Sequence, residues 1–138
     1  MDLNQHIQPG LFREDTYFVE EHQSAIHVGS GSLRVLATPW MIAFMEKTAR
    51  LLLSERLPAG YSSVGTHVDV RHLAPSAVGA RLRVRAEVLS VDALKVAFAV
   101  QAWDEQEQVG AGQHQRVVID EERFLRRIAA KTSKAEGS

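Results

Sequence analysis

Hydrophobic positions recur every three to four residues in one long stretch of the chain, residues 38–57. At about 100° per residue, one face of this stretch collects the side chains of Ile42, Glu46, Ala49 and Leu53. Thr38 is a residue type that caps helices, and Pro39 would fall at the first helical position, where its missing N–H costs nothing. Pro58 and Gly60 end the pattern. The sequence therefore predicts one long helix with Thr38 as its N-cap.

The period changes to two after this helix, which is typical of strands. Apolar and polar residues alternate over residues 64–72, 82–88, 94–102 and 109–119, and residues 16–19 form an earlier β-prone run. We expect Thr66 and His72 on one face of their strand and His67 on the other. The arginines at positions 81, 83 and 85 are expected on a solvated strand face. Residues 20–37 show little periodicity and predict an irregular, mobile segment.

The order strand, helix and then four strands with short connections predicts an antiparallel meander packed on the helix. Strands of up to about 11 residues would span roughly 36 Å. A long curved sheet around one helix is the hotdog fold, an α+β class, and its open edge invites pairing with a second subunit. Asp120 should cap a short terminal helix, and residues 131–138 should form a disordered tail.

The composition limits the function further. A chain of 138 residues indicates a single domain, with its core over residues 10–125. The net charge of −1 gives no electrostatic case for nucleic acid or an anionic membrane. There is no cysteine, which excludes disulfides and a cysteine nucleophile. The N-terminus lacks a secretory signal pattern, and no apolar run approaches the ~20 residues of a membrane helix. We expect a soluble cytoplasmic protein.

Glu46 is the polar residue that most needs an explanation, because a carboxylate in an apolar stripe is costly unless it is paired or hydrogen-bonded. It could pair with Arg50 one turn later, or it could be retained for chemistry. Burial would raise its pKa, which suits a general base. Together with Thr38 and His72 it supplies a carboxylate, a hydroxyl and an imidazole, the groups that acyl transfer requires. His67 and His72 point to opposite faces, so no metal site is expected.

Three segments carry a resemblance to a known family. They are Val35-Leu-Ala-Thr-Pro-Trp-Met-Ile-Ala-Phe-Met-Glu46, Ser63-Val-Gly-Thr66 with His72, and Gly110-Ala-Gly-Gln-His-Gln-Arg116. In combination they resemble hotdog-fold acyl-CoA thioesterases of the fluoroacetyl-CoA thioesterase type, over about residues 10–125. The resemblance implies that Thr38, Glu46 and His72 form the catalytic set. It also implies that Gly65 lines the acyl pocket, that Arg116 borders the site, and that the protein is a dimer with active sites near the subunit interface.

One segment departs from that family. The fluoroacetate-resistance enzymes carry aromatic residues ahead of the Ala-Thr pair, whereas this chain has Gly29-Ser-Gly-Ser32. The fold and the reaction class therefore carry over better than the fluorinated substrate does.

We accordingly expect hydrolysis of a short acyl-CoA thioester, with no cofactor, because coenzyme A is part of the substrate. Glu46 would attack the thioester or activate water, His72 would orient it or protonate the thiolate, and amides at the helix start would hold the oxyanion. Thr66, Gly65 and Arg116 would contact substrate. A dehydratase acting on a hydroxyacyl thioester and a non-catalytic acyl-CoA binding module are the two alternatives. Coenzyme A and an acyl carrier protein remain open as the carrier.

Overall fold

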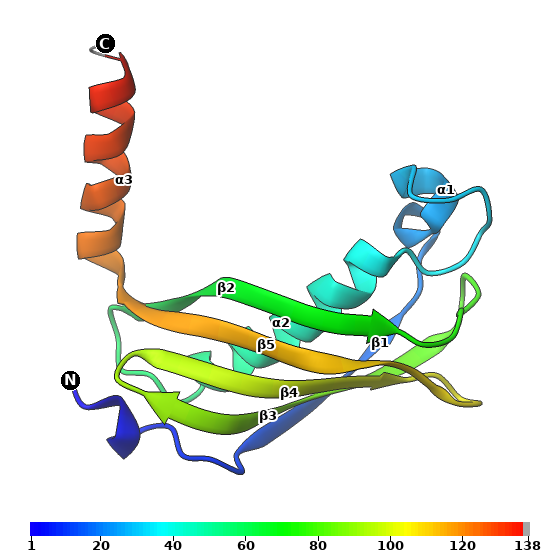
Figure 1. Ribbon diagram of the computed structural model, residues 1–138, viewed down its shortest axis with the longest axis horizontal. Helices are drawn as coiled ribbons and strands as arrows, with labels where there is room; N and C mark the ends of the chain where they lie inside the picture. Colours follow the sequence, from blue (N-terminus) through cyan, green and yellow to red (C-terminus); the bar gives the residue numbers. More distant parts are fainter. Residues whose placement is uncertain (137–138) are drawn as a thin grey trace.

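A computed structural model describes residues 1–136, and their side chains up to residue 134 (Figure 1). The strands are β1 Phe12–Phe18, β2 Tyr61–His72, β3 Arg81–Asp92, β4 Lys95–Trp103 and β5 Gln108–Asp120. The α-helices are α1 Ala25–Val28, α2 Thr38–Ser54 and α3 Glu121–Glu136, with short 3₁₀ turns η1 Leu3–Gln5 and η2 Glu21–Gln23.

The five strands form one antiparallel sheet in the order β1-β3-β4-β5-β2. β3, β4 and β5 form a meander, but β2 pairs with β5 rather than with β3, so the four-strand meander expected from the sequence is wrong. Residues 73–80 carry the chain from one side of the sheet to the other. Eight residues can span about 26 Å, more than the roughly 14 Å across three strand spacings, so this length permits the crossover.

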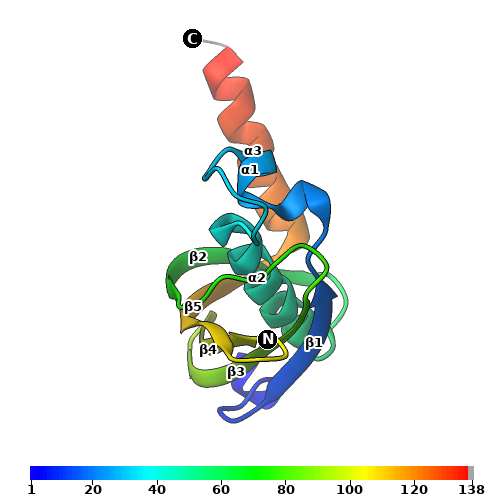
Figure 2. The same cartoon turned by 90° about the vertical axis from the view of Figure 1, so that its right-hand side faces the viewer.

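The sheet curves around α2, which lies within its concave face (Figure 2). The buried side of α2 consists of Met41, Phe44, Met45, Thr48, Ala49, Leu52 and Leu53. The sheet contributes the alternating residues that the sequence predicts, with Leu82, Val84 and Ala86 of β3 and Val96, Phe98, Val100 and Ala102 of β4 fully buried. Ile42 and Glu46 are only partly buried, because they lie at the edge of the helix's apolar face rather than in its centre. The hotdog architecture is thus confirmed.

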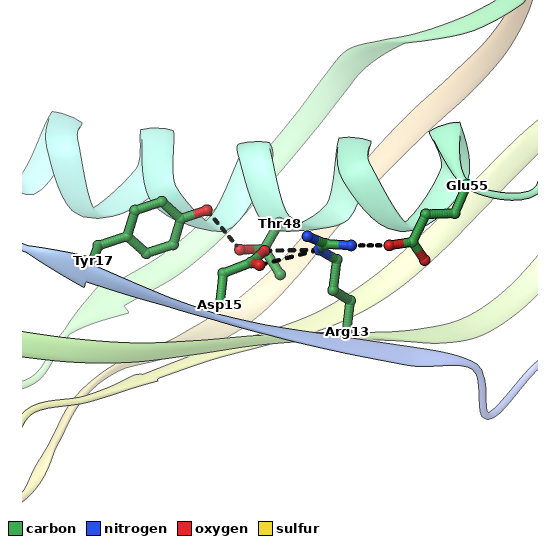
Figure 3. Close-up of polar contacts among 5 residues, drawn as sticks. All are labelled: Arg13, Asp15, Tyr17, Thr48 and Glu55. Carbon is green, nitrogen blue, oxygen red and sulfur yellow. Dashed lines mark hydrogen bonds and ion pairs between the residues drawn. The ribbon is translucent and has the colours of Figure 1, made fainter.

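Polar contacts join β1 to α2 (Figure 3). The Tyr17 hydroxyl lies 2.9 Å from Thr48 Oγ1, which satisfies a buried threonine in the helix. Arg13 forms an ion pair with Asp15 at 2.9 Å and contacts Glu55 just beyond the end of α2. These contacts hold the edge strand β1 against α2.

The start of α2 differs from the sequence-based prediction. Ala37 is the N-cap, and its carbonyl accepts hydrogen bonds from the amides of Trp40 and Met41. Thr38 is the first helical residue, so its hydroxyl does not cap the helix and is available for another contact. Residues 20–37 are also more ordered than expected. They contain η2 and α1, and bridges from Ser24 to Leu36 and from Val35 to Ala77 close the segment.

The helix at the C-terminus is longer than expected. The sequence predicts a short helix and a tail from residue 131, whereas α3 continues to Glu136 and projects away from the sheet (Figure 1). Asp120 caps it as predicted, accepting a hydrogen bond from the Arg123 amide at 3.1 Å. Residues 121–136 contain no glycine or proline and are rich in good helix formers, which explains the extension. Residues 137–138 of the predicted tail lie outside the described part of the chain.

None of the helices formed by residues 1–136 is both long enough and apolar enough to cross a membrane.

Candidate active site

Thr38 and His72 form a direct pair at the N-terminal end of α2. Thr38 Oγ1 lies 2.8 Å from His72 Nδ1. The backbone explains this meeting, because Leu36 donates to the Ser76 carbonyl and Val35 bridges Ala77. These contacts hold the residues before α2 against the residues after β2. Two of the three residues that the resemblance implies as a catalytic set are thus in direct contact.

Burial favours the neutral form of His72. Desolvation lowers the pKa of its imidazole below the ordinary value of 6.5, against a smaller opposing effect from a backbone contact with Ala74. Its Nε2 atom is buried and has no hydrogen-bond partner among the residues described. A buried polar atom without a partner is costly and rare. It marks a position at which an incoming group could be bound.

A cavity of about 400 Å³ opens beside this pair. Thr38 and His72 line it together with Val35, Leu36, Leu73 and Pro75. Its walls carry no charged side chain, so it suits an uncharged group. The backbone N–H of Thr38 has no acceptor among the described hydrogen bonds, while Pro39 has no N–H and the Trp40 N–H is taken by Ala37. The helix start therefore offers one free amide rather than several.

Glu46 belongs to a second cluster, further along α2 and beneath the first half of β2. A methyl group added at Gly65 would lie 3.8 Å from Glu46 Oε2, 3.5 Å from Arg116 Nη1 and 3.3 Å from His114 Cε1. These three side chains thus surround the space over Gly65. The described residues provide no hydrogen bond or ion pair to the Glu46 carboxylate, so the predicted alternative of a pair with Arg50 is not observed.

Arg116 is buried beside Glu46 and is held by β2. Its Nε donates to Ser63 Oγ at 2.9 Å and its Nη2 to the Ser63 carbonyl at 3.1 Å. Desolvation lowers the pKa of its guanidinium, while the charge of Glu46 raises it. A buried cation beside a carboxylate can hold a carboxylate or an oxyanion in place. Gly65, Arg116 and Glu46 therefore lie around one space. The resemblance to the thioesterase family implies that all three belong to the site.

The two clusters are separated within one chain. Thr38 and Glu46 are eight residues apart on the same helix, which corresponds to about 12 Å along its axis. His72 and Gly65 are likewise at different points along β2. Within one subunit, Thr38 and His72 therefore lie away from Glu46, the third residue of the set that the resemblance implies.

Thr66 is placed differently from the prediction. The pairing of β2 with β5 shifts between Gly65 and His67, so Thr66 is an extra residue in a β-bulge. Its side chain is exposed, and its hydroxyl donates to the Gln115 carbonyl at 3.3 Å. The strict alternation that placed Thr66 on the face of His72 fails at this residue, and the shared face is wrong.

Two glycines of β5 permit close packing behind the site. A methyl group at Gly110 would lie 2.5 Å from Met41 Sδ, and one at Gly112 would lie 2.2 Å from the Asp69 carbonyl oxygen. Gly110 therefore lets α2 approach β5, and Gly112 lets β2 approach β5.

Sequence reasoning did not assign a role to two residues of the second cluster, His114 and Ser63. Both are buried, at 1% and 7% exposure. The signal available was strand alternation, since His114 and Arg116 are two residues apart and must share the inner face of β5.

We expect the free energy of unfolding to decrease as the pH falls below 6.5. Burial lowers the pKa values of His72 and His114, so the unfolded chain binds more protons than the folded protein in this range. Their contribution to stability is present above pH 6.5 and is lost as the pH falls. Urea unfolding of the wild type and His72→Asn at pH 7.5, 6.5 and 5.5 measures it. The variant should show a flatter dependence, and equal slopes would contradict the expectation.

Gly65→Ala should impair turnover while leaving the fold intact. The added methyl is 3.3 Å from His114 and intrudes on the space bounded by Glu46 and Arg116. Small displacements of reacting groups can lower rates by up to about 100-fold, so we expect kcat/KM to fall roughly 10- to 100-fold. Gly110→Ala is the contrasting variant, because it collides with Met41 and should lower the Tm instead. Unchanged kcat/KM in Gly65→Ala would remove Gly65 from the site.

A family model and a relative of known activity both match this chain and point to the same family. A family model described as FlK, fluoroacetyl-CoA-specific thioesterase, matches residues 19–122. A fluoroacetyl-CoA thioesterase of Streptantibioticus cattleyicolor is 34% identical over 98 residues, which cover 71% of this chain and 70% of the relative.

Solved structures agree with this match. A variant of the fluoroacetyl-CoA thioesterase in complex with acetyl-CoA has a TM-score of 0.85 at 28% identity, covering 91% of this chain and 99% of the other. A thioesterase superfamily member from Thermus thermophilus has a TM-score of 0.88 at 25% identity, covering 96% and 98%.

Proposed function

This chain belongs to the fluoroacetyl-CoA-specific thioesterase family, and we propose that it hydrolyses a short, uncharged acyl-CoA thioester with Glu46 as the reactive carboxylate. The chain is an acyl-CoA thioesterase of the hotdog fold. The observation that carries the role of Glu46 is its partly buried carboxylate, which faces the space over Gly65 beside the buried guanidinium of Arg116. A binding module or a dehydratase is not favoured by any of the relatives.

Each residue of the site has a chemical task in this proposal. Glu46 attacks the thioester carbonyl or takes a proton from the attacking water. The free Thr38 N–H at the positive end of α2 stabilises the oxyanion. His72, oriented by the Thr38 hydroxyl, presents its unpartnered Nε2 to the substrate or to the departing group. No metal or organic cofactor takes part, because coenzyme A is supplied with the substrate.

We propose further that the active site is completed by a second copy of the chain. β2 is an edge strand, and its residues 65–69 are exposed in succession, although Val68 pairs with the inward-facing His114. An edge of this kind is a template for strand pairing. If two β2 strands pair antiparallel about Val68, His72 of one copy lies opposite Val64 of the other, next to its Gly65. The separation of Thr38 and His72 from Glu46 within one subunit would then be closed between subunits.

The acyl group is proposed from the cavity beside Thr38 and His72. Its walls carry no charged side chain, which favours a neutral acyl group over one that carries a second carboxylate. The relative from Streptantibioticus cattleyicolor is named for fluoroacetyl-CoA. We do not transfer that substrate to this chain, because Gly29-Ser-Gly-Ser32 leads into the cavity segment here.

Thiol release from a panel of acyl-CoA esters tests the activity. The chain has no cysteine, so a thiol reagent gives no background from the protein. Turnover of neutral short-chain esters, with poor turnover of succinyl-CoA or malonyl-CoA, is the expected result. Running the same acyl groups on acyl carrier protein identifies the preferred carrier. Binding of the whole panel without turnover would refute the proposed hydrolysis.

A further inference from the structure

His114 is buried at 1% exposure, and the proposed chemistry does not use it directly. Its Nδ1 lies 2.8 Å from the His67 carbonyl oxygen, and its Nε2 lies 3.2 Å from Arg116 Nη1. Its ring stacks at 6.2 Å on Phe98 in the core. The side chain therefore connects the bulged part of β2 to the arginine of the site.

The two contacts determine which ring nitrogen carries the proton. A carbonyl oxygen can only accept, so Nδ1 must be the donor to His67. Arg116 can only donate, so Nε2 must be unprotonated and accept. Only the neutral Nδ1–H tautomer makes both bonds. Desolvation lowers the pKa of this imidazole, with smaller effects from the charges of Arg116 and Glu46 and from His67, which agrees with the neutral form.

The bond to His114 completes the orientation of Arg116. Ser63 accepts from Nε and Nη2, and His114 accepts from Nη1, so three acceptors fix the plane of the guanidinium. Nη1 is also the arginine atom closest to the space over Gly65, at 3.5 Å from a methyl group placed there. The nitrogen that His114 holds is therefore the one that faces the same space as the Glu46 carboxylate.

We propose that His114 is a positioning residue of the thioesterase, which as the neutral Nδ1–H tautomer aims Arg116 Nη1 at the space between Gly65 and Glu46. The inference rests on the proposed function for its catalytic consequence. Loss of the acceptor would leave a buried N–H of Arg116 unpaired and free the guanidinium to turn towards another partner. Protonation of His114 would have the same effect and would add a second cation beside Arg116. The groups that face His114 are Arg116, Glu46 and His67.

The first test compares His114→Gln with His114→Leu. Glutamine can donate to the His67 carbonyl and accept from Arg116, whereas leucine can do neither. We expect His114→Leu to lower kcat/KM roughly 10- to 100-fold, and His114→Gln to restore most of it. Glutamine does not titrate, so the kcat of this variant should fall less at acid pH than the kcat of the wild type. Equal losses in both variants would overturn the proposal.

The second test is a double-mutant cycle with Arg116→Lys. If His114 acts through Arg116, adding His114→Leu to that variant should lower kcat/KM by less than about a further 2-fold. Multiplying losses would show an independent, merely structural role and would overturn the inference. Val118→Ala, a buried change on β5 outside the network, should lower the Tm without altering the pH profile.

A third measurement needs no turnover. Imidazole ¹⁵N shifts in the folded wild type should show His114 protonated on Nδ1 and unprotonated on Nε2 at neutral pH. The opposite tautomer, or a charged ring, would overturn the proposal even in an active enzyme. Failure of the wild type to hydrolyse any ester would instead refute the proposed function. The ¹⁵N shifts would still test whether His114 Nε2 is free to accept the hydrogen bond from Arg116.

Discussion

Replacing Glu46 by glutamine should lower kcat for thioester hydrolysis by about 100- to 10,000-fold, the range typical of a removed general base or nucleophile. Glutamine keeps the size and hydrogen-bonding capacity of the side chain but cannot accept the proton or form an anhydride. Glu46 accepts no hydrogen bond from a described residue, but its charge favours the charged form of the buried Arg116, so we expect the Tm to fall as well. Thiol release and thermal unfolding of the same preparation measure the two effects.

Glu105→Gln is the matched control. It removes the same charge from an exposed turn between β4 and β5, and it should retain wild-type kcat. Equal activity of Glu46→Gln and Glu105→Gln would remove Glu46 from the reaction. A single turnover of wild type in ¹⁸O-water separates the two mechanisms. Label in the Glu46 carboxylate indicates an anhydride that water opens at Glu46, whereas label in the product acid alone indicates that water attacks the acyl carbonyl.

Mixed dimers should recover activity that neither parent variant has. Glu46→Gln and His72→Asn each inactivate both sites of a homodimer if each site takes Glu46 from one subunit and His72 from the other. In a heterodimer of the two variants, one site then keeps both intact residues. Random mixing produces half heterodimers, so about one quarter of wild-type activity is expected, against at least a 100-fold loss in each parent.

The experiment requires co-expression or refolding of the two chains together with distinguishable tags, followed by thiol release. The unfractionated mixture should show about one quarter of wild-type activity, and the purified heterodimer about one half, because one of its two sites is intact. A heterodimer made of Glu46→Gln and Thr38→Ala should behave in the same way, because Thr38 lies with His72. A pair of Thr38→Ala and His72→Asn is the control and should stay inactive, since both residues serve the same end of the site. Inactive heterodimers in every combination would refute a site shared between subunits.

The sequence predicted the parts of the fold that depend on local repetition. The period-two pattern located β4 to within one residue at each end, whereas β3 runs four residues beyond its predicted end at residue 88. The inward residues of both strands are buried as expected. Family membership also follows from the segments around Thr38, Gly65 and Arg116. These features are visible because each depends on neighbouring residues or on short motifs.

Features that depend on distant contacts were less accessible. Whether Thr38 or Ala37 caps α2 is decided by the bridge from Val35 to Ala77, which sets where the helix begins. The residues of β2 alone do not specify that this strand pairs with β5 rather than with β3. The separation between Thr38 and Glu46 could be calculated from helix geometry, but its significance emerges only when His72 is seen at one end and Gly65 at the other.

The extra residue in β2 has a consequence for how this strand tolerates change. Before Thr66 the odd-numbered positions face the helix, as Ser63 and Gly65 do, and after it the even-numbered positions do, as Val70 and His72 do. A saturation mutagenesis scan of β2, scored by thioester turnover, should therefore show sensitivity that switches parity at Thr66. Deleting Thr66 would remove the bulge and give β2 one regular alternation, in which the residues of both halves keep their present faces. The inward-facing residues before Thr66 are thus constrained by the space around Glu46, and those after it by the contact of His72 with Thr38.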